Sequence, residues 1–219
     1  MKKNSPVVGI FAHPDDESFG PSGTIAKYAQ KRDVYVICVT DGDARGNNLH
    51  NLDLIREKEL KKSAKILGVK KVFFLRYRDG ELNNNLYHQV AGRIKRILDK
   101  LKPEILLTFE MRGLSGHIDH VFCSMVTSYL FFQSPYVNSL MYYAAPRFVS
   151  DKMKNYFIYF PPGYEKNQVD KVVDISDYSE LKKEAIKCHQ SQIGDVNLVL
   201  KLFGKIPKEE YFFIVQKKG

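Results

Sequence analysis

The chain has 219 residues, of which 44% are hydrophobic and 12% aromatic. That length suits one substantial domain with a packed core, and the composition excludes a globally disordered chain. Lys and Arg total 34 against 25 Asp and Glu, which gives a formal charge of +9. This surplus allows nucleic acid, an anionic membrane surface or a phosphorylated compound as a partner, but it does not choose among them.

Three cysteines, Cys38, Cys123 and Cys188, lie far apart and form neither a disulfide framework nor a CxxC metal site. Cys38 and Cys123 sit in apolar runs and are expected to be buried free thiols, which suits a reducing compartment. The most apolar run, residues 121–132, is shorter than the ~20 residues that span a bilayer. The apolar stretch 7–12 is too short for a signal peptide. We therefore expect a cytoplasmic protein with no transmembrane segment, for which membrane contact would be peripheral.

Short apolar runs alternate with helical segments along the chain. Strands are expected at residues 7–12, 34–40, 72–77, 105–109, 140–145, 171–175 and 211–216, helices at 22–32, 52–67, 85–101, 119–133 and 177–192, and irregular structure at 146–170 and 193–210. This β-α-β-α order predicts an α/β, Rossmann-like fold with a mostly parallel sheet flanked by helices. No linker or repeat divides the chain, so one domain is expected over residues 1–219.

Polar residues gather just after the predicted strands. In open parallel sheets ligands bind beyond the carboxyl ends of the strands, where the strand order reverses. With the order 3-2-1-4, the loops after the first and fourth strands flank that point. Residues 13–17 (His-Pro-Asp-Asp-Glu) follow the first strand, and residues 116–120 (Gly-His-Ile-Asp-His) follow the fourth. The sequence therefore predicts an active site at this edge of the sheet.

The two clusters carry the residue types of a catalytic metal site. His13 and Asp16 are three residues apart, and His117 and His120 repeat that spacing. Catalytic zinc usually takes three protein ligands and leaves one position for water. His13, Asp16 and one of the two later histidines satisfy that count, and the remaining histidine could stabilise an oxyanion. Asp15 suits a general base. The simpler interpretation of an acidic residue at this point is a cap on the following helix.

Four motifs resemble those of the LmbE-like, or PIG-L, family of zinc-dependent N-acetylglucosaminyl deacetylases. Residues 11–17 resemble the family signature, and residues 116–120 resemble its Gly-His-x-Asp-His element. Arg56 and Glu59 belong to an Arg-x-x-Glu-Leu motif, and His189 opens a His-x-Ser-Gln motif. The motifs occur in the family order and cover roughly residues 7–192.

This resemblance implies a single zinc held by His13, Asp16 and His120. It implies that Asp15 is the general base and that His117 stabilises the oxyanion, with Asp119 orienting His117 and favouring its charged form. Zinc-bound hydroxide would attack the acetamide of an N-acetylglucosamine-containing sugar or conjugate and release acetate. Iron or another divalent ion could replace zinc, because two imidazoles and a carboxylate accept several metals.

The substrate-binding residues are less sharply defined. Arg45, Arg56, Glu59 and His189 are predicted to contact substrate, and Arg112 is a further candidate; the alternatives are salt bridges for the arginines and a packed helix residue for His189. Glu17 is expected to support a metal ligand or to cap a helix. The pair Asp79-Gly80 favours a turn over a site.

Three other functions compete with deacetylation. An amidase that removes a larger acyl group would use the same residues with a different acyl pocket. A basic nucleotide- or nucleic-acid-binding domain fits the charge, but no recognition helix or aromatic basic strand supports it, so no nucleic acid is expected. A sugar-binding protein without turnover is disfavoured by the intact set of His and Asp residues. The oligomeric state is not predicted.

Overall fold

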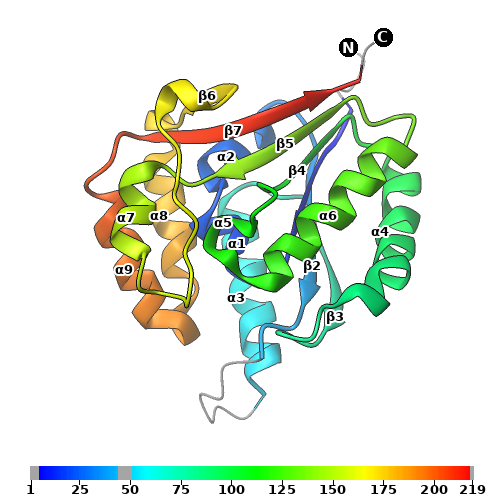
Figure 1. Cartoon of the computed structure of the whole chain (residues 1–219). Helices are drawn as coiled ribbons and strands as arrows, with labels where there is room; N and C mark the ends of the chain where they lie inside the picture. The colour runs from blue at the N-terminus through cyan, green and yellow to red at the C-terminus, as the bar shows by residue number, and fades with distance from the viewer. Residues whose placement is uncertain (1–4, 44–50, 218–219) are drawn as a thin grey trace.

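The computed structural model describes residues 5–43 and 51–217, and its elements alternate along the chain (Figure 1). The strands are β1 (Val7–Phe11), β2 (Val34–Thr40), β3 (Lys71–Tyr77), β4 (Ile105–Phe109), β5 (Ser139–Ala144), β6 (Lys171–Asp174) and β7 (Glu209–Gln216). The α-helices are α1 (Asp16–Phe19), α2 (Ser22–Ala29), α3 (Leu52–Ile66), α4 (Tyr87–Leu101), α5 (Gly113–Gly116), α6 (Ile118–Gln133), α7 (Arg147–Met153), α8 (Ser179–Lys187) and α9 (Ile193–Phe203). Short 3-10 turns are η1 (Asn84–Leu86), η2 (Lys166–Gln168), η3 (Ser176–Tyr178) and η4 (Gln190–Gln192).

The strands form one seven-stranded sheet in the order β3-β2-β1-β4-β5-β7-β6. The first five strands in this order are parallel, and β7 runs antiparallel to both β5 and β6. The predicted α/β fold, the mostly parallel sheet and the order 3-2-1-4 are confirmed. The order reverses between β1 and β4, so the loops that follow these two strands face each other across the carboxyl edge of the sheet.

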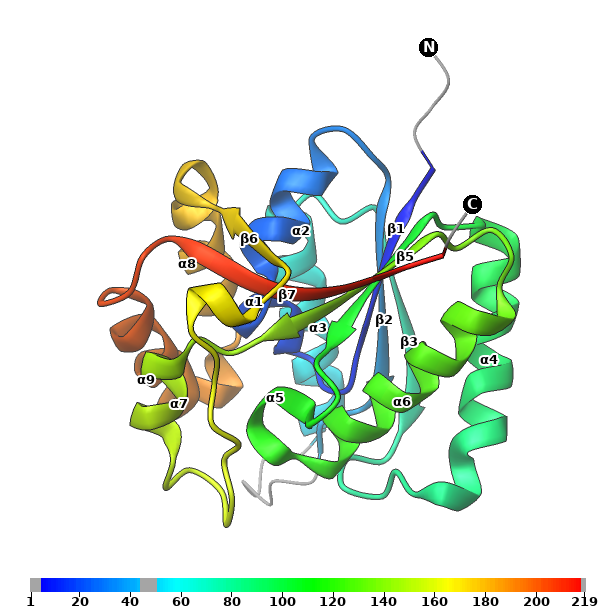
Figure 2. The ribbon, with the colours of Figure 1, turned by 45° about the horizontal axis from the view of Figure 1, so that its top comes forward.

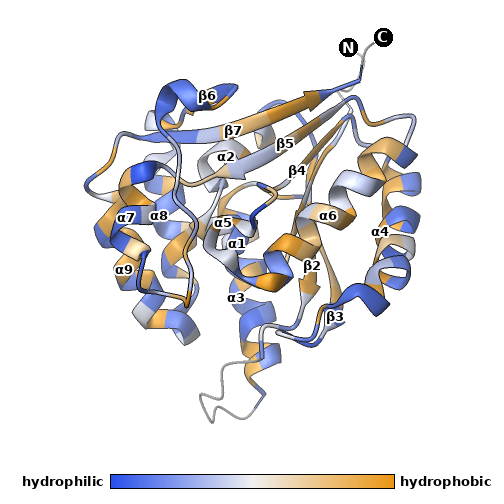
Figure 3. Cartoon of the chain, in the orientation of Figure 1, coloured by the Kyte–Doolittle hydropathy of each residue, from blue (hydrophilic) through white to orange (hydrophobic). Residues whose placement is uncertain are grey.

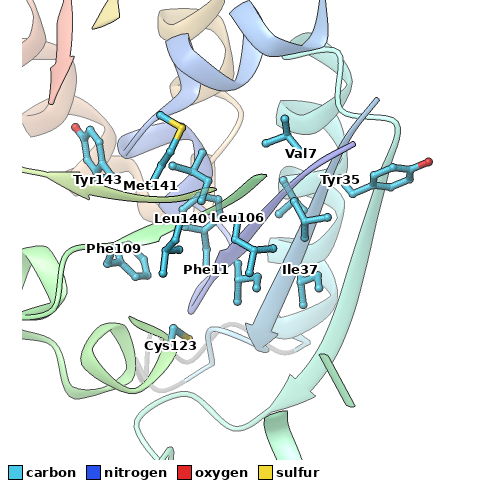
Figure 4. Close-up of a cluster of buried hydrophobic side chains, with 14 of the residues drawn as sticks. Val7, Phe11, Tyr35, Ile37, Leu106, Phe109, Cys123, Leu140, Met141 and Tyr143 are labelled. Carbon is cyan, nitrogen blue, oxygen red and sulfur yellow. The ribbon is translucent and has the colours of Figure 1, made fainter. Parts of the chain in front are cut away.

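Helices cover both faces of the sheet, with α4 and α6 on one face and α2, α3 and α8 on the other (Figure 2). Every residue of β1, β2 and β4 is buried as a result, which is why these strands read as continuous apolar runs in the sequence. Apolar colouring follows these central strands, and polar colouring marks the outer sides of the helices (Figure 3). Phe11 and Phe109 pack edge to face with ring centroids 5.5 Å apart, within the core cluster of Figure 4.

Two segments that the sequence left irregular are partly helical. Helix α7 lies within residues 146–170, and α9 lies within 193–210. The helix expected at 177–192 is shorter, because α8 ends at Lys187 and the chain turns at His189 into η4 and then α9. No helix among the described residues is long and apolar enough to cross a membrane.

Candidate active site

The turn after β1 carries the first three candidate residues. His13 follows the buried strand, and Asp16 begins the short helix α1. The backbone amide of His13 donates to Oδ2 of Asp16 at 2.6 Å, which fixes the carboxylate beside the imidazole. Asp15 is buried with them. The carboxylate of Asp16 therefore has a local structural role as well as a free oxygen, Oδ1, that faces the loop after β4.

His120 reaches this turn from the first turn of α6. Its Nε2 lies 3.2 Å from Asp16 Oδ1 and 3.1 Å from His13 Nδ1. His13 Nδ1 lies 3.5 Å from Asp16 Oδ2. A tetrahedral ion with bonds of about 2.0–2.2 Å separates its ligand atoms by about 3.3–3.6 Å. The distance between His13 and Asp16 falls in this range, and the two distances from His120 Nε2 are 0.1–0.2 Å shorter.

The hydrogen-bond partners of the two imidazoles assign their protons. His120 Nδ1 lies 3.0 Å from the carbonyl oxygen of Gly113, to which it donates, so Nε2 is left without a proton. His13 Nε2 faces the carboxylates of Asp79 and Asp119, so a neutral His13 keeps its proton on Nε2 and offers the Nδ1 lone pair. Each imidazole lies beside one oxygen of Asp16, His13 near Oδ2 and His120 near Oδ1. Side chains of these types could hold a metal ion.

Two further carboxylates support His13 from behind. Asp79 Oδ1 lies 3.0 Å from His13 Nε2, and Asp119 Oδ2 lies 3.4 Å from the same atom. Asp119 Oδ2 also accepts the backbone amide of Gly80 at 2.8 Å. Gly80, with φ of +79°, makes the turn that the sequence predicted. The same turn also brings Asp79 into the site, which the sequence interpretation missed. Its position directly after the third strand was the available signal.

Asp15 is held by an arginine from α3. Arg56 Nη2 lies 2.8 Å from Asp15 Oδ2, and Arg56 Nη1 donates to the carbonyl oxygen of Gly42 at 2.5 Å. Burial raises the pKa of Asp15 above its ordinary value, and the positive charge of Arg56 opposes that rise. The charge relationship is different at Asp16, where burial is outweighed by His120 and His13 and the pKa is held well below the usual range. The environments of these adjacent carboxyl groups therefore push their pKa values apart.

His117 occupies the N-cap position of α6. Its Nδ1 accepts the backbone amide of Asp119 at 3.1 Å, which leaves the proton of the neutral ring on Nε2. Burial, together with the charges of His13 and His120, lowers the pKa of His117 to about 4. Asp119 raises this pKa, but by less. Asp119 thus favours the charged form of His117, as expected, but burial and the two other histidines outweigh it. The backbone amide of Asp119 contacts His117, while its carboxylate contacts His13 and Gly80.

The remaining predicted residues are placed differently. Glu59 accepts the backbone amide and the hydroxyl of Ser191, at 2.8 and 2.6 Å, and thereby ties α3 to η4. His189 is fully buried, with Nε2 3.2 Å from Glu17 Oε1. Neither Glu59 nor His189 lines the cavity described below. Arg45 lies outside the described residues. Arg112 pairs with Glu110, as its alternative interpretation predicted.

A cavity of about 220 Å³ opens over the cluster. His13, Asp16 and His120 line it together with Asp15 and His117. Arg56 and Asp79 border it on the side of β2 and β3, and residues of α7 and α9 border it on the side of β5. The structure thus brings every predicted metal ligand and two of the three predicted catalytic residues to one cavity wall.

Known proteins share both the sequence and the fold. The model of the family described as PIG-L, GlcNAc-PI de-N-acetylase, matches residues 8–130. A probable N-acetyl-alpha-D-glucosaminyl L-malate deacetylase 2 of Bacillus anthracis is 30% identical over 202 residues, which cover 89% of this chain and 84% of that protein. The N,N'-diacetylchitobiose deacetylase structure from Pyrococcus horikoshii is 27% identical with a TM-score of 0.73, and the match covers 98% of this chain and 85% of that one.

The fold alone does not settle the reaction. The 4-carboxy-2-hydroxymuconate hydratase GalB from Pseudomonas putida matches with a TM-score of 0.71 over 98% of both chains, at 15% identity. A hydratase and deacetylases thus share this architecture, and function has to be argued from the site. The family match covers four of the five parallel strands, β1 to β4, and the loops that carry the whole cluster. This chain belongs to the PIG-L family.

Proposed function

We propose that the protein is a metal-dependent deacetylase that removes the N-acetyl group from an N-acetylglucosamine-containing sugar or conjugate. One observation carries the proposal: His13 Nδ1 and His120 Nε2 lie 3.1 Å apart and within 3.5 Å of the Asp16 carboxylate, in the wall of a cavity that Asp15 and His117 also line. The deacetylase relatives support the reaction type.

His13, Asp16 and His120 would hold the metal, and zinc is the ion that two imidazoles and one carboxylate suit well. When bound, the metal polarises an amide carbonyl and lowers the pKa of water. Asp79 and Asp119 hold the proton of His13 on Nε2 and keep Nδ1 free for the metal. A carboxylate in this position also makes the imidazole a stronger ligand.

Asp15 is the proposed general base. Its carboxylate takes a proton from water as the water oxygen adds to the carbonyl carbon. The raised pKa that burial gives Asp15 moves it closer to neutrality, where a base is most effective. Arg56 fixes the carboxylate in place and keeps it ionised when no substrate is bound.

His117 is the proposed oxyanion donor. In its neutral form the ring presents Nε2–H to the cavity, and this group can donate to the carbonyl oxygen as negative charge develops there. When the C–N bond breaks, the proton held by Asp15 passes to the leaving amine. The products are acetate and a free amino sugar, and Asp15 returns to its ionised form.

Arg56 and Asp79 are the proposed contacts for sugar hydroxyls, because both line the cavity beside the base. Arg56 Nε is buried with no hydrogen-bond partner among the described residues. Arg45 stays a prediction for the same function. The positions of Glu59 and His189 favour a structural role for both. We further propose a cytoplasmic location and no nucleic-acid partner.

The test is an Asp15→Asn variant assayed for bound zinc and for acetate release from N-acetylglucosamine, its oligomers, inositol conjugates and nucleotide sugars. Zinc should remain near one ion per chain, while turnover of the best substrate should fall by about 10²–10⁴-fold. Asp99→Asn, an exposed aspartate paired with Lys95, is the matched control and should behave as the wild type. Wild-type turnover in Asp15→Asn would refute the assignment of the base.

A further inference from the structure

The cavity has two chemically different halves. Its polar half consists of Asp15, Arg56, Asp79 and His117, which come from the loops and helices that follow β1, β2, β3 and β4. Its apolar half is lined mainly by residues of α7, of α9 and of the segment that follows α7. The helices α7 and α9 lie close together beside the end of β5 (Figure 1). We define the apolar half by Val149, Phe157, Phe160, Leu198, Leu202 and Phe203.

The apolar half begins beside the proposed oxyanion donor. Phe157 packs edge-on against His117, with ring centroids 5.8 Å apart. Phe160, Leu202 and Phe203 are buried further along the same wall. An apolar group that entered this half would therefore lie beside the proposed oxyanion donor.

Polar groups in this part of the wall already have partners within the protein. Lys182 Nζ lies 2.7 Å from Glu210 Oε1, and Tyr156 donates to Asp195 at 2.5 Å. Glu209 pairs with Lys166 at 2.6 Å. A ligand in the apolar half therefore meets hydrocarbon and satisfied polar groups. Such a wall favours a hydrocarbon chain over a sugar or an ion.

The amide of an N-acyl amino sugar has an amine side and an acyl side, and the two halves of the cavity suit different sides. The amine side of an amino-sugar amide carries hydroxyls, which match the charged polar half. The acyl side then faces the apolar half. An acetyl group has only one methyl to place there, whereas an apolar cavity of 150 Å³ in another protein holds benzene. The cavity here measures about 220 Å³ over both halves, and the six side chains that define its apolar half make a longer wall than one methyl group can cover.

We infer that the enzyme accepts N-acyl amino sugars with a linear acyl chain of medium length, and that the apolar half binds that chain. This inference rests on the proposed hydrolase function and specifies its acyl group. The chemistry is unchanged: the oxygen of water bonds to the acyl carbon, the C–N bond breaks, and the amine takes up the proton. The products are a medium-chain carboxylate and a free amino sugar.

The experiment compares N-acetyl-, N-butanoyl-, N-hexanoyl- and N-octanoylglucosamine, below micelle-forming concentrations, with the zinc-loaded full chain and amine release as the readout. Burial of each methylene can raise kcat/KM by up to about fourfold, so octanoyl should exceed acetyl by about tenfold or more. Octyl N-acetylglucosaminide, which carries the same chain on the sugar, should show no comparable gain. An acetyl optimum, or an equal gain from the octyl glycoside, would overturn the inference.

A blocked cavity provides the second readout. Leu198→Trp should lower the octanoyl-to-acetyl ratio of kcat/KM by about tenfold or more, because the indole fills the apolar half. Ile193→Trp is the matched control, because Ile193 is half exposed on the same helix and does not line the cavity. Val149→Phe narrows the cavity from its opposite wall, and it serves as the test variant if Leu198→Trp has a much lower Tm than the wild type. An unchanged ratio in a folded variant rejects the assigned chain site. Zinc-loaded protein that hydrolyses none of these amides, nor the substrates screened with Asp15→Asn, would refute the hydrolase function itself.

Discussion

Arg56 Nη2 lies 2.8 Å from Asp15 Oδ2, and both side chains are buried at the wall of the cavity. The guanidinium is itself fixed by the carbonyl oxygen of Gly42. Since burial raises the pKa of Asp15 and Arg56 opposes that rise, the arginine sets the pH at which the proposed base becomes ionised.

Removal of this charge should move the pH profile. Arg56→Gln should raise the pKa of Asp15 further, so the base is lost at a higher pH and the acidic limb of kcat/KM against pH shifts upward by about one unit or more. Arg32→Gln removes an arginine that pairs with Glu104 outside the cavity and is the control. An acidic limb that stays in place in zinc-loaded Arg56→Gln would show that Arg56 does not tune the base.

Asp79 should tighten the metal site through His13. Asp79→Asn leaves the three proposed ligands intact but weakens the acceptor 3.0 Å from His13 Nε2. We expect zinc affinity to fall by about 10–100-fold, as measured by competition with a chelating dye. Asp41 accepts the backbone amide of Asp79 and does not contact His13 in the structure, so Asp41→Asn is the control. Equal affinities for all three proteins would argue against a role for Asp79.

Metal should stabilise the folded chain. A ligand at 100 times its Kd adds about 2.7 kcal/mol to the free energy of unfolding, which corresponds to a rise in Tm of about 5–10 °C for a chain of this length. Chelator-treated protein should show this rise when zinc is added back, and Asp16→Asn should show little of it. A comparable rise in Asp16→Asn would mean that the stabilising ion binds elsewhere.

His189 should contribute pH-dependent stability through Glu17. Burial lowers the pKa of His189, but the charge and hydrogen bond of Glu17 outweigh it and the pKa is raised above 6.5. A raised pKa in the folded state means that the contribution is complete below about pH 6.5 and is lost as the pH rises through the folded-state value. His189→Asn should therefore lose about 3 kcal/mol or more at low pH.

Urea unfolding of wild type and His189→Asn between pH 6 and 9 measures this contribution. The difference between the two proteins should shrink as the pH rises; loss of metal at low pH is common to both and cancels. His88→Asn, on α4, is the control and should show no pH-dependent difference. If the difference in the free energy of unfolding between the two proteins stays constant with pH, His189 stabilises the protein through packing alone.

The sequence was informative wherever one physical requirement dominated. Burial on both faces makes β1, β2 and β4 continuous apolar runs, and this pattern predicts the strands. The spacing His-x-x-Asp and His-x-x-His survives in the structure because each pair spans a single tight turn. These local patterns predicted that His13 and Asp16 would meet one of the two later histidines, and the family resemblance chose His120.

The sequence failed where one residue serves two purposes. Helix α9 buries Val196 away from the cavity, while Leu198, Leu202 and Phe203 line the cavity. Apolar residues on more than one side leave no single stripe of helical period, so the helix could not be recognised. The sequence indicated a turn at Asp79 and Gly80, and Gly80 does make one. No local sequence pattern shows that the carboxylate of Asp79 reaches His13. The family resemblance assigned Asp119 to His117, whereas its carboxylate turns toward His13.

The capping role of His117 makes the start of α6 sensitive to acid. Nδ1 of His117 is the acceptor that closes the first turn of this sixteen-residue helix. A second proton on the ring would have to occupy that same atom, so protonation and capping are mutually exclusive. The hydrogen bond from the backbone amide of Asp119 therefore favours the neutral form of the His117 ring. His120 lies in the same first turn, so protonation of His117 would also loosen the backbone that positions this proposed metal ligand.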